Sequence, residues 1–473
     1  MHERIGAALE SMYAENLDDQ LAELAYHYSR SDNGGKAVEF CLRACQQCDE
    51  RGSYAEALVH YESGLAALQK LPDDDRRGEL ELDLRIASLG ALASIKNYGS
   101  TEVEQSAVRA IELGQRAGVD WEKSWWPLGA LQSMSIARPD TRKACELATE
   151  LVARAEQHGD PEHIAQAVFA LAFANMQMGA FRLAAEGFDR GAAIYESMPK
   201  SPTSFRRNGL RHHTLYNDQA QICATSSINL SLLGCPDRAL ERINAAISLA
   251  RESPSKDSQM MVHSFACHVY QHRRDLNALR DHVKSALALA NELGDVFQRS
   301  WSEIYLGWLD AMSGDLGPGI ARIRHHLSAL RTAGTEVMTG HFLVMIAEAL
   351  GQQKQFDEGL RTIEPVFSFV ERTNDRLYEA ELHRFKGELL IMWDASNAAQ
   401  AEQCFRTGIA VSRRQHARLW ELRASTSLAR LLRDTNRRDE ARTMLDAIYT
   451  WFTEGFDTAD LKDAKVLLDE LNN

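Results

Sequence analysis

The sequence predicts an all-α fold, a right-handed superhelical solenoid of about ten or eleven antiparallel helix pairs with a period of about 40 residues. Apolar residues recur at helical spacing on one face, as in "LGCPDRALERINAAISLA" at 233–250. Segments much like it return along the chain. Proline is scarce, at 10 of 473 residues, whereas Ala, Leu, Glu and Arg, which favour helix, are abundant. Stacked repeats are expected to contact only their neighbours.

Small residues mark the repeat and measure its period. Their spacings are 40, 55, 39, 41, 40, 42 and 40 residues between the anchors Ala144, Ala184, Ala239, Ala278, Gly319, Gly359, Ala401 and Ala441. A second small residue lies twelve positions before most anchors, or fourteen in one case: Ala172, Ser227, Ala266, Gly307, Ala347, Gly387 and Ala429. Two small residues at a fixed distance indicate the crossing of two antiparallel helices, because larger side chains would push the backbones apart.

Turn residues divide the chain into these pairs. Gly, Pro and Asp separate the helices at 178–182, 233–237, 313–319 and 353–358. We expect irregular helical repeats over 1–120, regular repeats over 121–198 and 219–454, an inserted loop at 199–218, and a C-terminal capping helix at 455–473. Such a cap covers the last apolar face of a solenoid.

Composition and charge narrow the class of protein. The formal net charge of −14 argues against nucleic acid as a partner, because that needs a basic surface. No window approaches about 18 uncharged apolar residues, which predicts no membrane span. The N-terminus lacks the apolar core of a signal peptide, and eight cysteines in so long a chain do not indicate a disulfide scaffold. We therefore expect a cytoplasmic protein with reduced thiols.

Three clusters suggest chemistry but also have structural explanations. Cys41, Cys45 and Cys48 have the spacing of an iron–sulfur loop, yet their helical context favours small residues in a helix–helix seam. His268 and His272 could hold zinc, but solvent-facing or partner-facing histidines are the preferred interpretation. The tryptophans of "WEKSWWP" at 121–127 favour a core wedge over a ligand-stacking surface. The sequence predicts no metal site, no cofactor and no catalytic residues.

The resemblance to known proteins rests on several segments of this chain. The small-residue arrangement looks like the tetratricopeptide repeat, with a period longer than the usual one. A closer resemblance lies in the segments 24–44, 232–240, 379–391, "CFRTGIAVSRRQHARLWELRASTSLARLL" at 404–432 and "WFTEGFDTADLKDAKVLLDEL" at 451–471. They look like the C-terminal helical region of bacterial proteins that join a class III adenylate/guanylate cyclase domain to a signalling ATPase. In that family the repeats are taken to be the sensory or partner-binding part. The resemblance therefore implies the same role for the repeats of this chain.

This chain departs from the whole family pattern. It has no G-x-x-x-x-G-K-[ST] loop, and "NGGKA" at 33–37 is too short to be one. No paired aspartates in a strand-rich region suggest a cyclase. We therefore expect either a fragment of a longer protein or a stand-alone repeat protein of that descent.

The concave face of the solenoid is the expected binding surface. Inward positions on the first helix of each pair fall one and four after, and three and six before, its small residue. That register selects Gln221, His263, Tyr270, Trp301, Trp308, His341, Glu348, Arg384, Glu388, Arg423, Arg430 and Arg433.

The inserted loop is a second candidate site, because insertions in solenoids often lie on the binding face. It gathers residues that could meet a carboxylate or phosphate: Arg206, Arg207, Arg211, His212, His213 and Tyr216. A solvated linker is the alternative.

The sequence thus predicts a non-catalytic scaffold or sensor module that binds a partner protein, a peptide or a small effector, and that regulates a signalling ATPase or cyclase. The alternatives are a C-terminal fragment of a nucleotidyl cyclase–ATPase enzyme, or a fragment of an ATPase-type transcriptional regulator. The sequence leaves the oligomeric state open.

Overall fold

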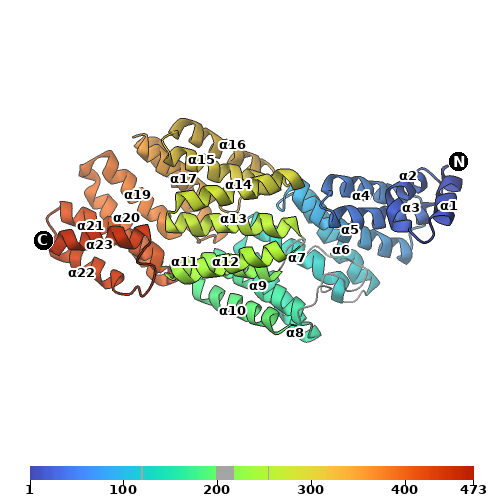
Figure 1. Ribbon diagram of the computed structural model, residues 1–473, viewed down its shortest axis with the longest axis horizontal. Helices are drawn as coiled ribbons and strands as arrows, with labels where there is room; N and C mark the ends of the chain where they lie inside the picture. Colours follow the sequence, from blue (N-terminus) through green and yellow to red (C-terminus); the bar gives the residue numbers. More distant parts are fainter. Residues whose placement is uncertain (119–120, 199–217, 254, 473) are drawn as a thin grey trace.

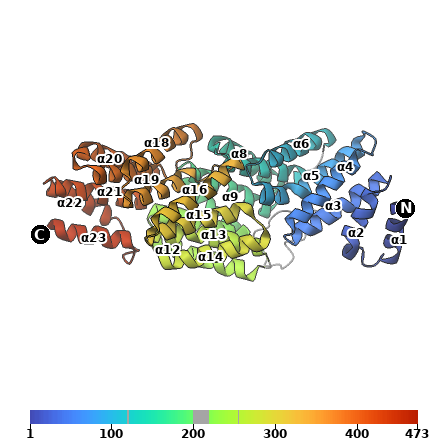
Figure 2. The ribbon, with the colours of Figure 1, turned by 90° about the horizontal axis from the view of Figure 1, so that it is seen from above.

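The structure is a computed structural model that describes residues 1–118, 121–198, 218–253 and 255–472. Within these ranges it contains 23 α-helices, two short 3₁₀ helices and no strand. The helices form an elongated right-handed superhelix with the termini at opposite ends (Figures 1 and 2), which confirms the predicted all-α solenoid. No helix in the described ranges combines the length and apolar character that crossing a membrane requires.

The α-helices are α1 (His2–Met12), α2 (Leu21–Ser29), α3 (Gly34–Glu50), α4 (Tyr54–Leu68), α5 (Asp75–Lys96), α6 (Thr101–Ala117), α7 (Trp121–Ala137), α8 (Thr141–His158), α9 (Pro161–Gln177), α10 (Phe181–Ser197), α11 (Asp218–Leu233), α12 (Pro236–Glu252), α13 (Lys256–Arg273), α14 (Leu276–Leu293), α15 (Val296–Met312), α16 (Leu316–Thr332), α17 (Thr339–Gln352), α18 (Phe356–Thr373), α19 (Glu379–Trp393), α20 (Ala398–Gln415), α21 (Arg418–Asp434), α22 (Arg438–Tyr449) and α23 (Ala459–Asn472). The 3₁₀ helices are η1 (Leu17–Gln20) and η2 (Ala395–Asn397).

Local signals start and stop these helices. Asp275 and Asp295 cap α14 and α15, each accepting a hydrogen bond from the backbone N–H three residues on. Between them, α14 ends at Gly294, whose φ of 71° is the left-handed conformation that glycine adopts at helix C-termini. The same combination of glycine and aspartate separates α8 from α9 at Gly159 and Asp160. At these two turns a few consecutive residues therefore specify where one helix ends and the next begins.

The small residues lie where paired helices cross, as the spacing predicted. A Cβ atom added to Gly307 of α15 would come within 2.8 Å of the Gly319 carbonyl oxygen on α16. A Cβ on Gly187 of α10 would meet Ala172 of α9 at the same distance, and one on Gly387 would enter the Phe405 ring. Close backbone approach is what allows each pair to bury its apolar stripe against the next.

The superhelix also closes on itself, which the sequence did not predict. The Ala137 carbonyl accepts hydrogen bonds from the backbone N–H groups of Glu336 and Val337, and the Gln177 carbonyl accepts one from Arg376. Both contacts join residues about 200 positions apart, or about five repeats of 40. The expectation that repeats touch only their neighbours is therefore wrong, because successive turns of the superhelix pack on one another.

Candidate functional site

The described part of the superhelix forms two large, partly open chambers, one charged and one apolar. The charged chamber has a volume of about 550 Å³ and lies among the inner helices α13, α15, α17, α19 and α21, with α23 at one side. Its polar and aromatic lining includes Gln271, His272, Arg274, Trp308, His341, Glu348, Tyr378, Glu381, Arg384, Glu388, Trp420, Arg423, Ser427, Arg430, Asp460 and Asp463.

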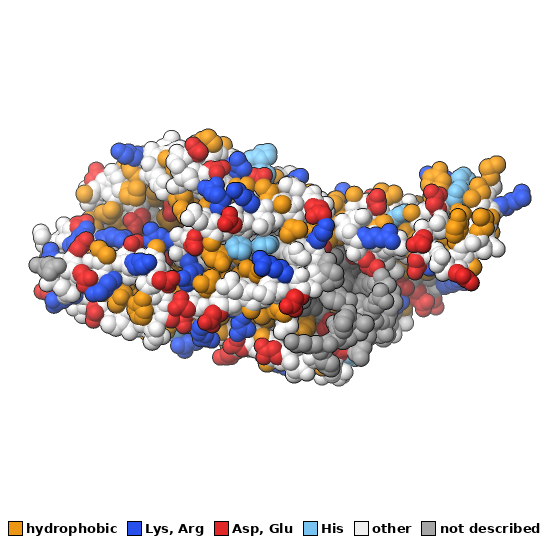
Figure 3. Space-filling model, in the orientation of Figure 1, with side chains coloured by type: hydrophobic (Ala, Val, Ile, Leu, Met, Phe, Trp, Pro, Cys, Tyr) orange, Lys and Arg blue, Asp and Glu red, His pale blue; other side chains and the backbone are white. Residues whose placement is uncertain are grey.

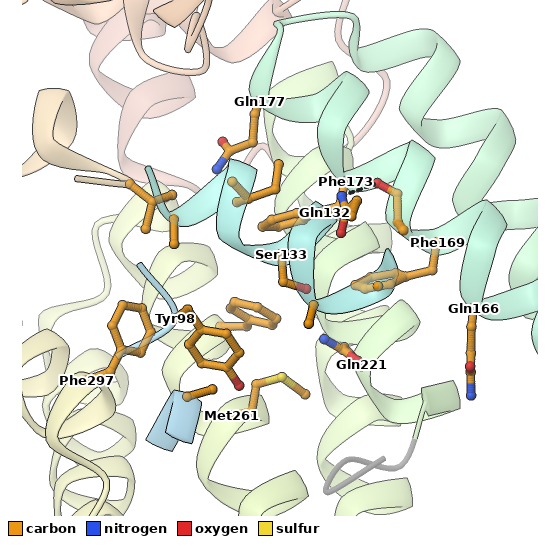
Figure 4. Close-up of a pocket in the computed structure, with 18 of the residues that line it drawn as sticks. Tyr98, Gln132, Ser133, Gln166, Phe169, Phe173, Gln177, Gln221, Met261 and Phe297 are labelled. Carbon is orange, nitrogen blue, oxygen red and sulfur yellow. Dashed lines mark hydrogen bonds between the residues drawn. The ribbon is translucent and has the colours of Figure 1, made fainter. Parts of the chain in front are cut away.

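The apolar chamber has a volume of about 370 Å³ and lies among α5, α7, α9, α11, α13 and α15 (Figure 4). Its lining contains Tyr98, Trp125, Trp126, Gly129, Gln132, Ser133, Gln166, Phe169, Phe173, Gln177, Gln221, Met261, Phe265, His268, Phe297 and Trp301, together with smaller apolar residues. In the 121–127 segment Trp125 is buried in the core, and Trp125 and Trp126 also line this chamber.

Two arginines at the charged chamber are held in place by carboxylates that have little exposure. The Arg384 guanidinium donates two parallel hydrogen bonds of 2.8 Å to Glu381, whose side chain is only 4% exposed. Burial alone would lower the pKa of Arg384, but the charges of Glu381, Glu388 and Glu348 raise it. Arg423 donates to Asp460 at 2.9 Å and to the His272 carbonyl at 2.9 Å. These two cations are consequently fixed in position.

A line of polar side chains runs across successive inner helices at one position of the repeat. Trp308, Glu348, Glu388 and Arg430 each follow the small residue of their helix directly. The Trp308 indole N–H donates a hydrogen bond of 2.8 Å to Glu348, and the Ser427 hydroxyl donates one of 2.5 Å to Glu388. Burial raises the pKa of Glu348, although the bond from Trp308 opposes that shift.

Arg430 ends this line and differs from the other arginines. It is exposed, and it forms no ion pair or hydrogen bond with any residue in the described part of the chain. The charged chamber thus presents fixed carboxylates and one arginine whose guanidinium remains available to an anion.

An aromatic wall separates the two chambers. His268 lines the apolar chamber, whereas His272, His341 and Tyr378 line the charged one. The Tyr305 hydroxyl and the His268 Nδ1 lie 2.9 Å apart, and the His341 ring stacks on Tyr378 with centroids 4.1 Å apart. Burial lowers the pKa of His268 to about 3, so this imidazole is neutral.

Burial overturns the preferred interpretation of these histidines. His268 and His272 are 2% and 4% exposed, so neither faces solvent. Among the described residues no group of three or more His, Cys, Asp or Glu side chains could hold a metal ion. Both histidines instead pack against aromatic rings, His272 against Trp420 at 5.2 Å between centroids.

The structure brings most of the predicted concave residues together. Seven line the charged chamber, and they are Trp308, His341, Glu348, Arg384, Glu388, Arg423 and Arg430. Gln221 and Trp301 line the apolar chamber. The loop residues Arg206, Arg207, Arg211, His212 and Tyr216 lie outside the described residues.

Three predicted positions lie elsewhere. His263 and Tyr270 contact His282 on α14, at 2.8 Å between the His Nδ1 atoms and 4.9 Å between the stacked rings. They line neither chamber, because α13 turns His268 and His272 inward instead. Arg433 is paired with Glu470 at 2.6 Å.

Several chamber residues were missed by sequence reasoning. Glu381 lies six residues before Gly387, the same offset that selected His341 and Arg423, so the register itself could have found it. Asp460 and Asp463 come from α23, which the sequence assigned only a capping role. No sequence signal indicated that α23 would approach α13.

Fold and chambers together define a tetratricopeptide-like helical repeat protein. No family model matches the chain. The uncharacterized protein R02095 of Rhizobium meliloti (strain 1021) is 21% identical over 406 residues, which is 82% of this chain and 37% of that protein. The chain therefore spans little more than a third of the length of this relative.

Two solved structures are similar to this chain. A Rap protein complexed with Competence and Sporulation Factor has a TM-score of 0.50 and 11% identity, covering 86% of this chain and 99% of that one. A signal transduction ATPase with numerous domains and a tetratricopeptide repeat sensor, from Pyrococcus horikoshii, has a TM-score of 0.40 and 11% identity, covering 86% and 56%. At 11% identity the likeness to the Rap protein concerns the fold alone.

Proposed function

We propose that this chain is a non-catalytic sensor module whose charged chamber holds a peptide or a short segment of a partner protein. The observation that carries the proposal is the line Trp308, Glu348, Glu388 and Arg430 across four successive inner helices. A peptide offers N–H donors and cationic groups to the carboxylates, and carboxylates to Arg430.

Pre-organisation supports this use of the chamber. Arg384 and Arg423 are 14% and 15% exposed, and each is fixed by a carboxylate, so a ligand would meet an ordered surface. Groups that are already ordered lose little side-chain entropy on binding. The Rap protein of the same fold was crystallised with Competence and Sporulation Factor, so this architecture can hold a ligand.

The regulated partner in this proposal is a signalling ATPase or nucleotidyl cyclase. The support is the resemblance of 404–432 and 451–471 to the repeat region of such proteins. The relative R02095 is also much longer than the matched region, which leaves room for further domains in that protein. The chain alone carries no phosphate-cradling loop of the G-x-x-x-x-G-K-[ST] type, so release of phosphate from Mg-ATP by the purified chain would contradict a non-catalytic role.

A phage-displayed library of short random peptides, selected on the immobilised chain, tests the binding proposal. Selected peptides are then measured by fluorescence polarisation against wild type and two variants. Arg430→Glu should weaken binding by about tenfold or more and reduce its dependence on salt. The matched control is Arg361→Glu on the outer helix α18, where Arg361 is 73% exposed and should not affect binding. Peptides that bind the Arg430 variant as tightly as wild type would refute the charged chamber as the site.

A further inference from the structure

The apolar chamber differs from the charged one in the chemistry of its wall. Its lining contains no Lys, Arg, Asp or Glu among the described residues. Eight aromatic side chains contribute to it, and they are Tyr98, Trp125, Trp126, Phe169, Phe173, Phe265, Phe297 and Trp301. A charged ligand would lose its hydration here without gaining a counter-charge from the described lining residues, whereas an aromatic ligand would gain ring contacts on several sides.

Two buried polar atoms at this wall have no hydrogen-bond partner in the described structure. They are the Oε1 of Gln177, whose residue is 3% exposed, and the Nε1 of Trp301, whose residue is 7% exposed. Buried polar atoms in folded proteins are almost always hydrogen-bonded, so each unpaired atom needs an explanation. Almost none of either atom's surface is open to the chamber, so a ligand would meet mainly the aromatic and aliphatic wall.

The apolar chamber has unoccupied space beside the inner helix α7. A Cβ atom added to Gly129 would meet nothing within 4 Å, although this glycine lies in a helix and lines the chamber. Figure 4 shows three side chains around a common space: Ser133 of α7, Met261 of α13, and Tyr98 from the segment between α5 and α6. A glycine destabilises a helix relative to alanine, so its presence at an unobstructed position is consistent with keeping that space free.

We propose that the apolar chamber binds a neutral, largely aromatic small molecule. The volume of about 370 Å³ lies in the range of small-molecule pockets. This site does not depend on the proposed peptide site, because the wall of His268, Tyr305, His341 and Tyr378 lies between the two chambers.

A fluorescent probe tests the proposal directly. N-Phenyl-1-naphthylamine is neutral and aromatic and carries an N–H donor, and its emission rises in apolar surroundings. Titration of the full chain should show saturable binding at one site, with loss of tryptophan emission because Trp125, Trp126 and Trp301 line the chamber. The anionic probe 8-anilino-1-naphthalenesulfonate should bind about tenfold more weakly or worse. Absence of saturable binding, or equal affinity for the anionic probe, would overturn the proposal.

Filling the chamber locates the bound probe. Gly129→Leu adds a side chain where nothing lies within 4 Å, and should weaken probe binding by about tenfold or more while circular dichroism and thermal melting show an intact fold. The matched control is Gly78→Leu, another helical glycine, whose Cβ would make only an ordinary contact of 3.7 Å with Leu113. Ser133→Met repeats the test at a second lining position, in case the leucine variant does not fold. Unchanged probe affinity in a folded filling variant would place the probe elsewhere and refute the site.

Discussion

The Tyr54 hydroxyl donates a hydrogen bond of 2.5 Å to the Asp257 carboxylate, and the two residues are 203 positions apart in the chain. Tyr54 begins α4 in the N-terminal part of the superhelix, and Asp257 lies in the first turn of α13. Burial raises the pKa of Asp257 to about 6, against the effect of the Tyr54 hydrogen bond. This pair therefore joins one turn of the superhelix to the next through a buried polar contact.

Replacing the tyrosine by phenylalanine should weaken that contact. Tyr54→Phe keeps the ring but removes one hydrogen-bond donor from a buried carboxylate, which should lower the free energy of unfolding by about 1–3 kcal/mol. Chemical denaturation followed by circular dichroism measures the loss. The control is Tyr26→Phe, because Tyr26 is 49% exposed and should tolerate the change. Equal stability of the two variants would mean that the inter-turn contact contributes nothing.

A second inter-turn contact depends on glycine alone. A Cβ atom at Gly99 would overlap the Gly334 carbonyl oxygen and crowd the Thr335 backbone, and a backbone atom cannot rotate away as a side chain can. Gly99→Ala should therefore lower the melting temperature by several degrees, corresponding to about 1–3 kcal/mol. Gly129→Ala provides the comparison, since that position is unobstructed and helical. A Gly99 variant that melts like wild type would show that the turns can separate at no cost.

The buried histidines should make stability depend on pH. Burial, and then the charge of Arg423, hold the pKa of His272 well below 6.5, and neither ring nitrogen has a hydrogen-bond partner in the described structure. Below pH 6.5 His272 becomes protonated in the unfolded chain but stays neutral in the folded chain. This residue therefore lowers the free energy of unfolding as the pH falls.

His272→Leu removes that proton uptake and an unpaired polar ring. The variant should be more stable than wild type, and its advantage should be larger at pH 5 than at pH 8 by on the order of 1 kcal/mol. Denaturation of both proteins at the two pH values measures the difference, and His325→Leu on the exposed face of α16 gives the baseline. An advantage that does not grow on acidification would contradict the linkage.

The cysteines of α3 should behave as packing residues. Burial raises the pKa of the Cys41 thiol to about 12, and it raises that of Cys45 further. Cys41, Cys45, Cys223 and Cys267 are buried, whereas Cys48, Cys145, Cys235 and Cys404 are partly accessible. In a thiol assay with a disulfide reagent, the four buried cysteines should react only after denaturation. Rapid reaction of all eight in the native protein would be the opposing result.

Local residues alone determined the helix pairs and their order. Asp275 and Asp295 cap helices through atoms three residues away, and Gly307 and Gly319 lie in adjacent helices, so short segments carry the whole signal. The same repeat register found Glu348, Glu388 and Arg430, because the inner helices from α15 to α21 keep a common orientation.

The tertiary structure decided how the helix pairs are rotated and stacked relative to one another. The register failed at His263 and Tyr270, where α13 rotates to place His268 and His272 in the wall between the chambers. Tyr54 reaches Asp257 only because the superhelix closes after about five repeats. That closure is the sum of small rotations between successive pairs, each set by packing along the full interface. A local pattern specifies each pair, but the accumulated rotation brings residues about 200 positions apart into contact and divides the interior into a charged and an apolar chamber.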